Sequence, residues 1–201
     1  MTITEIPVEL SLPPSTGRSE GTHVSGIIRC LATELGILTP DVTEELSLSD
    51  VREIKDPTAI LRILMGLAWE EKYIPLIGDV DDHPREMELQ GVYMTHDGES
   101  VSCILGCNHY MLVCHEIKCT WKSARTVASA IEQQHMWMWQ IKAYCKALGT
   151  RFAMLHVLFV CGDYSYPIRP VLRKWLLEFT QDEIDQNWEM LMQYRTYREA
   201  Q

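Results

Sequence analysis

The sequence lacks the features that would place the protein in a membrane or on a signal-directed route. Its apolar runs are short, and one of the longest, Phe152 to Cys161, contains His156, whereas a membrane-spanning helix needs about 20 mainly apolar residues. The first residues contain no basic segment followed by an apolar block, so we expect no signal peptide. These absences predict a cytoplasmic, intracellular protein with no membrane partner.

The sequence also lacks an excess of basic residues. Its formal net charge is −10, from 18 Lys and Arg against 28 Asp and Glu. This balance argues against a protein that coats nucleic acid over its whole surface, because such proteins are broadly positive. Any site for a polyanion must therefore be a local patch.

No CxxC pair occurs among the seven cysteines. The spacing of Cys103 and Cys107 is a weak metal signal without a second pair of the right kind. We expect reduced, partly buried thiols, as in other intracellular proteins. A zinc site that uses Cys103, Cys107, Cys114 and Cys119 stays open as an alternative.

The length of 201 residues and the 46% apolar content predict one globular domain. Residues 1–22 hold three prolines and two glycines and are predicted to be an arm or loop, with the single domain at 23–201. Residues 41–56 are predicted to be an acidic connector, and Val171 to Phe179 is either a strand or a short helix. The periodicity predicts further elements in this order: a helix over 23–36, a helix from Pro57, strands Met87–Met94, Val101–Leu105 and Tyr110–Lys118, a long helix over 125–147, a strand Phe152–Val160, and a helix from Thr180 to Arg198.

Local signals refine these boundaries. Ser25 is the expected N-cap of the first helix and Gly36 its expected stop. Thr180 and Glu183 form a capping box for the last helix. Turns are predicted at 96–98 and 106–108. The predicted fold class is α/β, with one central mixed β-sheet flanked by helices.

One group of charged residues indicates chemistry. Glu116 and Lys118 are two positions apart on a predicted strand, so they share a face while Ile117 points to the other. Asp97 lies nineteen residues before Glu116, which fits one strand and a turn back to the same end of the sheet. Two close carboxylates repel each other, and protonation or a divalent cation relieves this. The group is either a structural ion pair or a site for Mg²⁺ or Mn²⁺ beside a water-positioning lysine.

The following helix adds polar groups and positive charge. Gln140 and Tyr144 are four residues apart and share a helix face. From Lys118 to Arg151 the chain has six basic residues, Lys122 among them, and one acidic residue. This stretch could follow a phosphate backbone, although a solvated helix face explains it equally well.

In this order, Asp97, Glu116-Ile117-Lys118 and Gln140-x-x-x-Tyr144 resemble the motifs of the PD-(D/E)XK nuclease superfamily, in its RecB-like and lambda-exonuclease-like branch. Gly66 and Glu70 are similar to the Gly-x-x-x-Glu that these families carry on a helix before the sheet. Residues 23–30, with Ser25 and Arg29, are similar to the opening helix that approaches DNA. The resemblance covers about residues 23–160 and implies a restriction-endonuclease-like core.

The resemblance also implies roles. Glu70, Asp97, Glu116 and the Ile117 carbonyl would hold Mg²⁺ or Mn²⁺, and Lys118 would position or activate the attacking water. Gln140 and Tyr144 would support the site and contact DNA, as would Ser25, Arg29 and Lys122. The implied activity is a metal-dependent deoxyribonuclease, an exonuclease of recombination or repair, possible as a homo-oligomer.

The sequence departs from the family pattern at two points. His96 stands where the name-giving motif has proline, and Glu71 beside Glu70 makes the helical ligand ambiguous. Some relatives hold an iron–sulfur cluster with one early cysteine and a late group of three. Only Cys161 follows the long helix, so we expect no cluster. Action on RNA, or binding of nucleic acid without cleavage, are the alternative functions.

Overall fold

The structure is a computed structural model that describes residues 19–38, 48, 56–78, 80–81, 85–103 and 110–201. Residues 1–18 of the predicted arm over 1–22, most of the acidic connector and the predicted turn at 106–108 lie outside the described residues. Among the helices that are described, none combines the length and the apolar character needed to cross a membrane.

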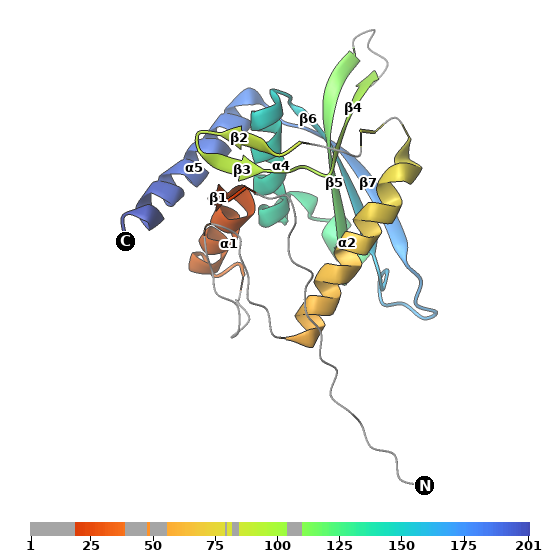
Figure 1. Cartoon of the computed structure of the whole chain (residues 1–201). Helices are drawn as coiled ribbons and strands as arrows, with labels where there is room; N and C mark the ends of the chain where they lie inside the picture. Colours follow the sequence, from red (N-terminus) through yellow and green to blue (C-terminus); the bar gives the residue numbers. More distant parts are fainter. Residues whose placement is uncertain (1–18, 39–47, 49–55, 79, 82–84, 104–109) are drawn as a thin grey trace.

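A four-stranded mixed sheet forms the centre of the molecule (Figure 1). Its strands are β4 (Gly98–Cys103), β5 (Tyr110–Thr120), β6 (Phe152–Phe159) and β7 (Val171–Glu178), in the order β4-β5-β6-β7. The central pair β5 and β6 is parallel, and both outer pairs are antiparallel. The predicted mixed central sheet is confirmed, and the segment from Val171 is a strand.

The predicted strand Met87–Met94 is wrong, because it is a hairpin in a separate small sheet. Strands β2 (Met87–Leu89) and β3 (Val92–Met94) are antiparallel, and β1 (Thr22–His23) pairs with β3. Gln90 and Gly91 between β2 and β3 have φ values of 54° and 75°. Positive φ at two consecutive residues is the geometry of a tight two-residue hairpin. The chain thus changes sheet between Met94 and Gly98, the segment that carries Asp97.

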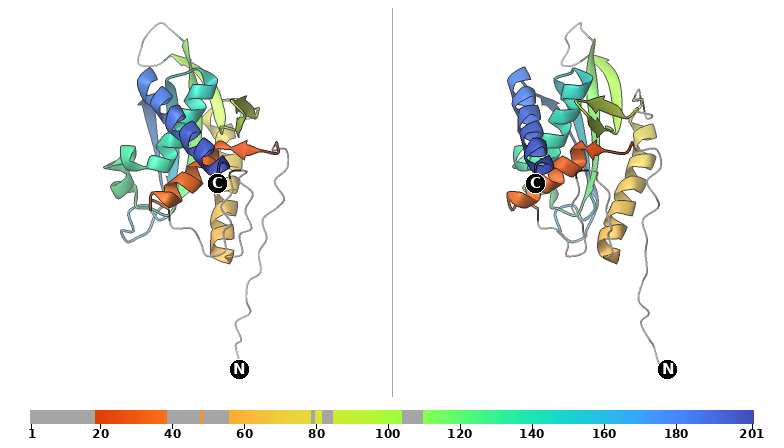
Figure 2. Two further views of the ribbon diagram at one scale, coloured as in Figure 1. Left: turned by 90° about the vertical axis from the view of Figure 1, so that its left-hand side faces the viewer. Right: turned by 60° about the vertical axis from the view of Figure 1, so that its left-hand side comes forward.

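The helices cover the two faces of the central sheet unequally. Figure 2 shows α4 (His135–Leu148) and α5 (Gln181–Glu199) on one face and α2 (Pro57–Ile77) on the other. Helix α1 (Val24–Glu34) packs against α4 and α5. The main core lies on the α4 side, where alternate residues of β6 such as Leu155 and Phe159 are fully buried. Helix α2 buries only two of its side chains, Ile60 and Ile74.

Two predicted helix boundaries are wrong, and two are confirmed. The N-cap of α1 is His23 instead of Ser25, because extended β1 runs up to His23 and places Ser25 inside the first turn. The long helix over 125–147 is broken into α3 (Ala124–Ala128), a 3-10 turn (Ile131–Gln133) and α4. Gly36 follows the end of α1 with a φ of 69°, and the capping box of Thr180 and Glu183 begins α5 as predicted.

A hydrogen-bonded row of polar side chains lies between α2 and the sheet. Tyr73 Oη is 3.1 Å from His156 Nδ1, His156 Nε2 is 3.0 Å from His115 Nδ1, and His115 Nε2 is 2.9 Å from Ser100 Oγ. We call these four residues the histidine row. Ser100, His115 and His156 are all buried, on three neighbouring strands. Neutral imidazole has one donor and one acceptor nitrogen, so the row is satisfied with both rings uncharged, which is the state that their burial favours.

Acid should therefore destabilise the fold through His156. Burial, followed by the charges of His115 and Lys174, lowers the pKa of His156 to about 3, whereas an unfolded histidine titrates near 6.5. Between these values the unfolded chain binds more protons, so the free energy of unfolding should fall as the pH falls from about 6.5, by up to about 1.4 kcal/mol per pH unit. Urea unfolding at pH 7.5, 6 and 5 measures this slope. His156→Gln should show a shallower slope, and parallel losses in both proteins would contradict the assignment.

Candidate active site

Asp97 lies at the start of β4 and faces the middle of β5. Its Oδ2 accepts a hydrogen bond from the Ile117 backbone N–H at 2.6 Å, while Gly98 pairs with His115. A Cβ at Gly98 would meet Val80 Cγ1 at 2.6 Å, so this position needs glycine for steric reasons. The register of β4 on β5 thus brings the Asp97 carboxylate beside Glu116, across neighbouring strands.

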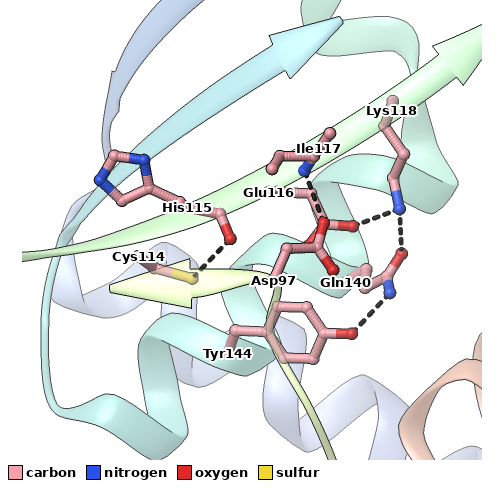
Figure 3. A network of polar contacts seen from close by, with 8 residues as sticks. All are labelled: Asp97, Cys114, His115, Glu116, Ile117, Lys118, Gln140 and Tyr144. Atoms are coloured by element: carbon pink, nitrogen blue, oxygen red, sulfur yellow. Dashed lines mark hydrogen bonds and ion pairs between the residues drawn. The ribbon is translucent and has the colours of Figure 1, made fainter. Parts of the chain in front are cut away.

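Glu116 and Lys118 form an ion pair on the same face of β5 (Figure 3). Glu116 is 0% exposed and its Oε1 contacts Lys118 Nζ. The neighbouring Glu116, Asp97 and Glu70 charges raise the pKa of Lys118, although burial acts in the opposite direction. Lys118 is therefore held as an ammonium, although its side chain is 22% exposed.

Gln140 and Tyr144 of α4 complete a chain of contacts that starts at Glu116. Lys118 Nζ donates to Gln140 Oε1 at 3.1 Å, and Gln140 Nε2 donates to Tyr144 Oη at 2.6 Å. Burial, followed by the Glu116 and Asp97 charges, holds the pKa of Tyr144 well above its usual value, so the phenol stays protonated. The two contacts fix which way the Gln140 amide points, and hence the direction of the Lys118 ammonium.

The carboxylates of this group repel each other. Burial is the largest cause that raises the pKa of Asp97 well above its usual value, and the Glu116 and Glu70 charges act in the same direction. The Lys118 charge and the Ile117 N–H compensate only in part. Glu70 of α2 thus acts on both Asp97 and Lys118, whereas Glu71 is exposed and pairs with Lys72. This supports Glu70 as the acidic group of α2 that faces the site.

The carboxylates of Asp97 and Glu116 provide part of the ligand set that a hard divalent cation needs. Glu116 Oε2 is buried and accepts no hydrogen bond from the described residues, and Asp97 adds a second carboxylate beside it. Carboxylate oxygens are the ligands that Mg²⁺ and Mn²⁺ prefer. No three His, Cys, Asp or Glu side chains within the described ranges are grouped closely enough to hold a metal ion. The structure therefore shows a two-carboxylate centre with Glu70 acting on it, and no complete three-carboxylate cluster.

The resemblance also implies that Ser25, Arg29 and Lys122 contact DNA, and these three side chains differ in their exposure. Arg29 is 6% exposed and Ser25 is partly buried on the same helix, α1. Lys122 is exposed just beyond β5, where its Nζ donates to Gln134 Oε1 at 2.7 Å and lies over the Trp137 ring. Lys122 is accessible to a ligand, whereas the burial of Arg29 leaves it little surface for direct contact.

Sequence reasoning missed His96 as a part of this site. His96 is buried, its Nε2 is 3.2 Å from Glu99 Oε2, and its ring centroid is 6.3 Å from that of Tyr144. Burial lowers the pKa of His96, which favours the neutral ring. Cys114 lies fully buried two residues before Glu116 on the same face. The signal for His96 was its place directly before Asp97, where the family pattern has proline.

The thiols that the zinc alternative requires do not converge. Cys103 pairs with Tyr110 at one end of β5, and Cys119 lies nine residues further along this strand. At about 3.3 Å per residue these two cysteines are ~30 Å apart. Cys107 lies outside the described residues. The described cysteines therefore argue against a shared zinc site.

Comparison with solved structures identifies proteins of the same fold. The chain is similar to a phage-related exonuclease from Haemophilus somnus 129PT, with a TM-score of 0.53 and 13% identity over 88% of this chain and 92% of that one. It is also similar to the alkaline exonuclease LHK-Exo from Laribacter hongkongensis in complex with dAMP, with a TM-score of 0.50 and 14% identity over 90% of this chain and 88% of that one.

Sequence comparison adds no closer relative. No protein-family model matches the chain, and no curated protein is significantly similar to it. At 13–14% identity the structural likeness shows the fold. The chain therefore has the fold of these exonucleases, as its resemblance to the PD-(D/E)XK superfamily predicted.

Asp97→Asn should raise the melting temperature of the protein in metal-free buffer at pH 7. The substitution removes a half-buried charge that its surroundings destabilise, while the amide oxygen can still accept the Ile117 N–H. Thermal unfolding with EDTA measures the effect. Asp185→Asn is the control, because hydrogen bonds from Lys146 and Gln181 lower the pKa of this surface carboxyl and its loss should not stabilise. A clear fall in the melting temperature of Asp97→Asn would contradict the repulsion.

Proposed function

We propose that the protein is a divalent-metal-dependent nuclease that hydrolyses phosphodiester bonds of DNA, as an exonuclease in recombination or repair. The observation that carries this proposal is the group of buried Glu116 with half-buried Asp97 and Lys118, which Gln140 and Tyr144 support from α4. Two carboxylates that repel each other beside an ammonium fit a centre that binds a cation and acts on an anionic substrate.

Asp97, Glu116, the Ile117 carbonyl and Glu70 would hold Mg²⁺ or Mn²⁺. When bound, such an ion lowers the pKa of a coordinated water and stabilises the charge of the phosphoryl transition state. The repulsion at Asp97 supports this assignment, because a cation would offset it. Glu70 completes the set from a different element, so the position of α2 affects how well the ion is held.

Lys118 acts as an ammonium in this mechanism. Because neighbouring carboxylates raise its pKa, the protonated amine can donate a hydrogen bond to the attacking water or to a phosphate oxygen, and it is poorly suited to accept a proton. Gln140 keeps the ammonium in place through the 3.1 Å contact, and Tyr144 keeps Gln140 in place. Lys118 therefore orients the water and stabilises developing negative charge.

DNA is the favoured substrate. One structure of the same fold is an exonuclease in complex with dAMP, which is a deoxynucleotide. The exposed Lys122 and Arg125 follow β5 directly and could contact a backbone that approaches Lys118. RNA as substrate is the alternative, and a binding module without cleavage is less well supported because the acidic pair and the lysine are both present.

Glu70→Gln should weaken metal-dependent cleavage by at least about tenfold at limiting Mn²⁺, because it removes one charge that acts on the centre. Glu71→Gln is a matched control on the adjacent, exposed residue and should cleave like the wild type. Cleavage rates across a Mn²⁺ titration measure both. A loss in Glu71→Gln with normal activity in Glu70→Gln would reverse the assignment of the helical ligand.

Digestion of end-labelled linear and closed-circular DNA, single- and double-stranded, with Mg²⁺ or Mn²⁺ tests the activity. We expect degradation of linear DNA from its ends, no cutting of closed circles, and loss of activity with EDTA. Lys118→Met should reduce the rate by at least about 100-fold, since it removes the ammonium and keeps the stem. Lys146→Ala, which disrupts only an ion pair with Asp185, is the control.

The outcomes separate the alternatives. Degradation of RNA alone would favour the RNA-directed function, and binding of DNA without cleavage under every metal would favour the binding module. Near-normal cleavage by a folded Lys118→Met protein would count against the whole assignment.

A further inference from the structure

We propose that the histidine row is a positioning device for the candidate metal centre: the chain of hydrogen bonds from Tyr73 to Ser100 holds Glu70 at the position that cation binding requires. This inference rests on the proposed function and concerns residues on the opposite face of the sheet from the site. None of the four residues contacts the carboxylates as a ligand; they act through the elements that carry them.

The row connects the three elements that supply the three carboxylates. Tyr73 lies three residues after Glu70 on α2, Ser100 three residues after Asp97 on β4, and His115 directly before Glu116 on β5. His156 joins Tyr73 to His115 from β6. A displacement of one element relative to another would therefore have to break a hydrogen bond in the row.

Helix α2 needs such an anchor because its packing fixes it weakly. Ile60 and Ile74 are its buried residues, while Leu61, Met65 and Leu67 on the same helix are exposed. Ile63, Leu64 and Ile77 are half-buried along the same side of the helix, but apolar packing is non-directional and permits small rotations of the helix about its axis. A directional hydrogen bond near Glu70 restricts that rotation.

Ring contacts make the row rigid. Tyr73 stacks on Trp69, the residue before Glu70, with ring centroids 4.7 Å apart. Tyr73 also meets the edge of His156 at 5.5 Å, and the rings of His156 and His115 stack at 5.2 Å. The two residues that flank the Glu70 turn, Trp69 and Tyr73, are thus fixed to each other and to the sheet.

The row is also buried, which makes its hydrogen bonds specific. His156 is 0% exposed, and loss of the Tyr73 hydroxyl would leave its Nδ1 without the partner it has now. A buried polar atom without a partner favours rearrangement of its surroundings. We expect α2 to shift in that case, and Glu70 with it, while the hydrophobic core on the α4 side stays intact.

The test is Tyr73→Phe, which keeps the ring and removes the hydroxyl. Calorimetric titration with Mn²⁺ alone should show binding weakened by about fivefold, the effect expected for one hydrogen bond. In DNA cleavage the half-saturating Mn²⁺ concentration should rise by a similar factor, and kcat should recover at saturating Mn²⁺. Tyr110→Phe, on a tyrosine that is 77% exposed, is the matched control and should match the wild type in both assays.

A purely structural role predicts a different result. It would lower the melting temperature of Tyr73→Phe and leave the Mn²⁺ isotherm of the folded protein unchanged, and that outcome overturns the inference. Should Tyr73→Phe fail to fold, Ser100→Ala decides, because it removes the hydrogen bond at the far end of the row. Weaker Mn²⁺ binding in Ser100→Ala supports positioning, and unchanged binding rejects it.

The wild type separates this inference from the function on which it rests. Wild-type protein that binds no Mn²⁺ and cleaves no DNA rejects the proposed function, and the positioning role falls with it. Wild-type protein that binds and cleaves, together with a folded Tyr73→Phe variant whose isotherm superposes on it, rejects the positioning role alone.

Discussion

The close approach of two carboxylates, one of them fully buried, to one ammonium is the constraint on which the structure of the site depends. Glu116 is fully buried, and Asp97 is held against it by the Ile117 N–H. Lys118 neutralises one negative charge, so one remains in a region of low dielectric, where its desolvation is costly. A fold that served stability alone would gain from apolar residues here. A bound cation would offset the remaining negative charge, and this would account for the arrangement.

Strand β5 separates two polar systems by the alternation of its side chains. Glu116 and Lys118 face α4 and the hydrophobic core, while His115 and Ile117 face α2. The same strand thus carries the reactive group on one side and the histidine row on the other. Because neighbouring residues of a strand are rigidly linked, the proposed positioning by the row would reach Glu116 through the backbone of β5. Helix α2 also links the two systems, because it carries Tyr73 of the row and Glu70, whose charge acts on Asp97 and Lys118.

Much of this arrangement could be predicted from the sequence, because it follows from short-range periodicity. Two-residue spacing put Glu116 and Lys118 on one face, four-residue spacing put Gln140 and Tyr144 on another, and the antiparallel return placed Asp97 opposite Glu116. The capping box at Thr180 was equally local. These features need no knowledge of distant contacts.

The features that could not be predicted lack a local signal in the sequence. The split of Met87–Met94 into two strands depends on positive φ at Gln90, and glutamine gives no signal for that. The break in the helix over 125–147 occurs without glycine or proline. The histidine row joins Tyr73, Ser100, His115 and His156, which are up to 83 residues apart in the sequence, so its existence depends on the complete sheet register. The sequence shows each polar residue within an apolar strand, but it does not show which residue is its hydrogen-bond partner.

The measurement that tests the central claim most directly is anomalous diffraction from crystals of the protein soaked in Mn²⁺. The account predicts a manganese peak in contact with carboxylate oxygens of both Asp97 and Glu116, with Lys118 beside it and not bound to the ion. A well-ordered site with no peak between these two carboxylates, or manganese bound only elsewhere on the chain, would contradict it.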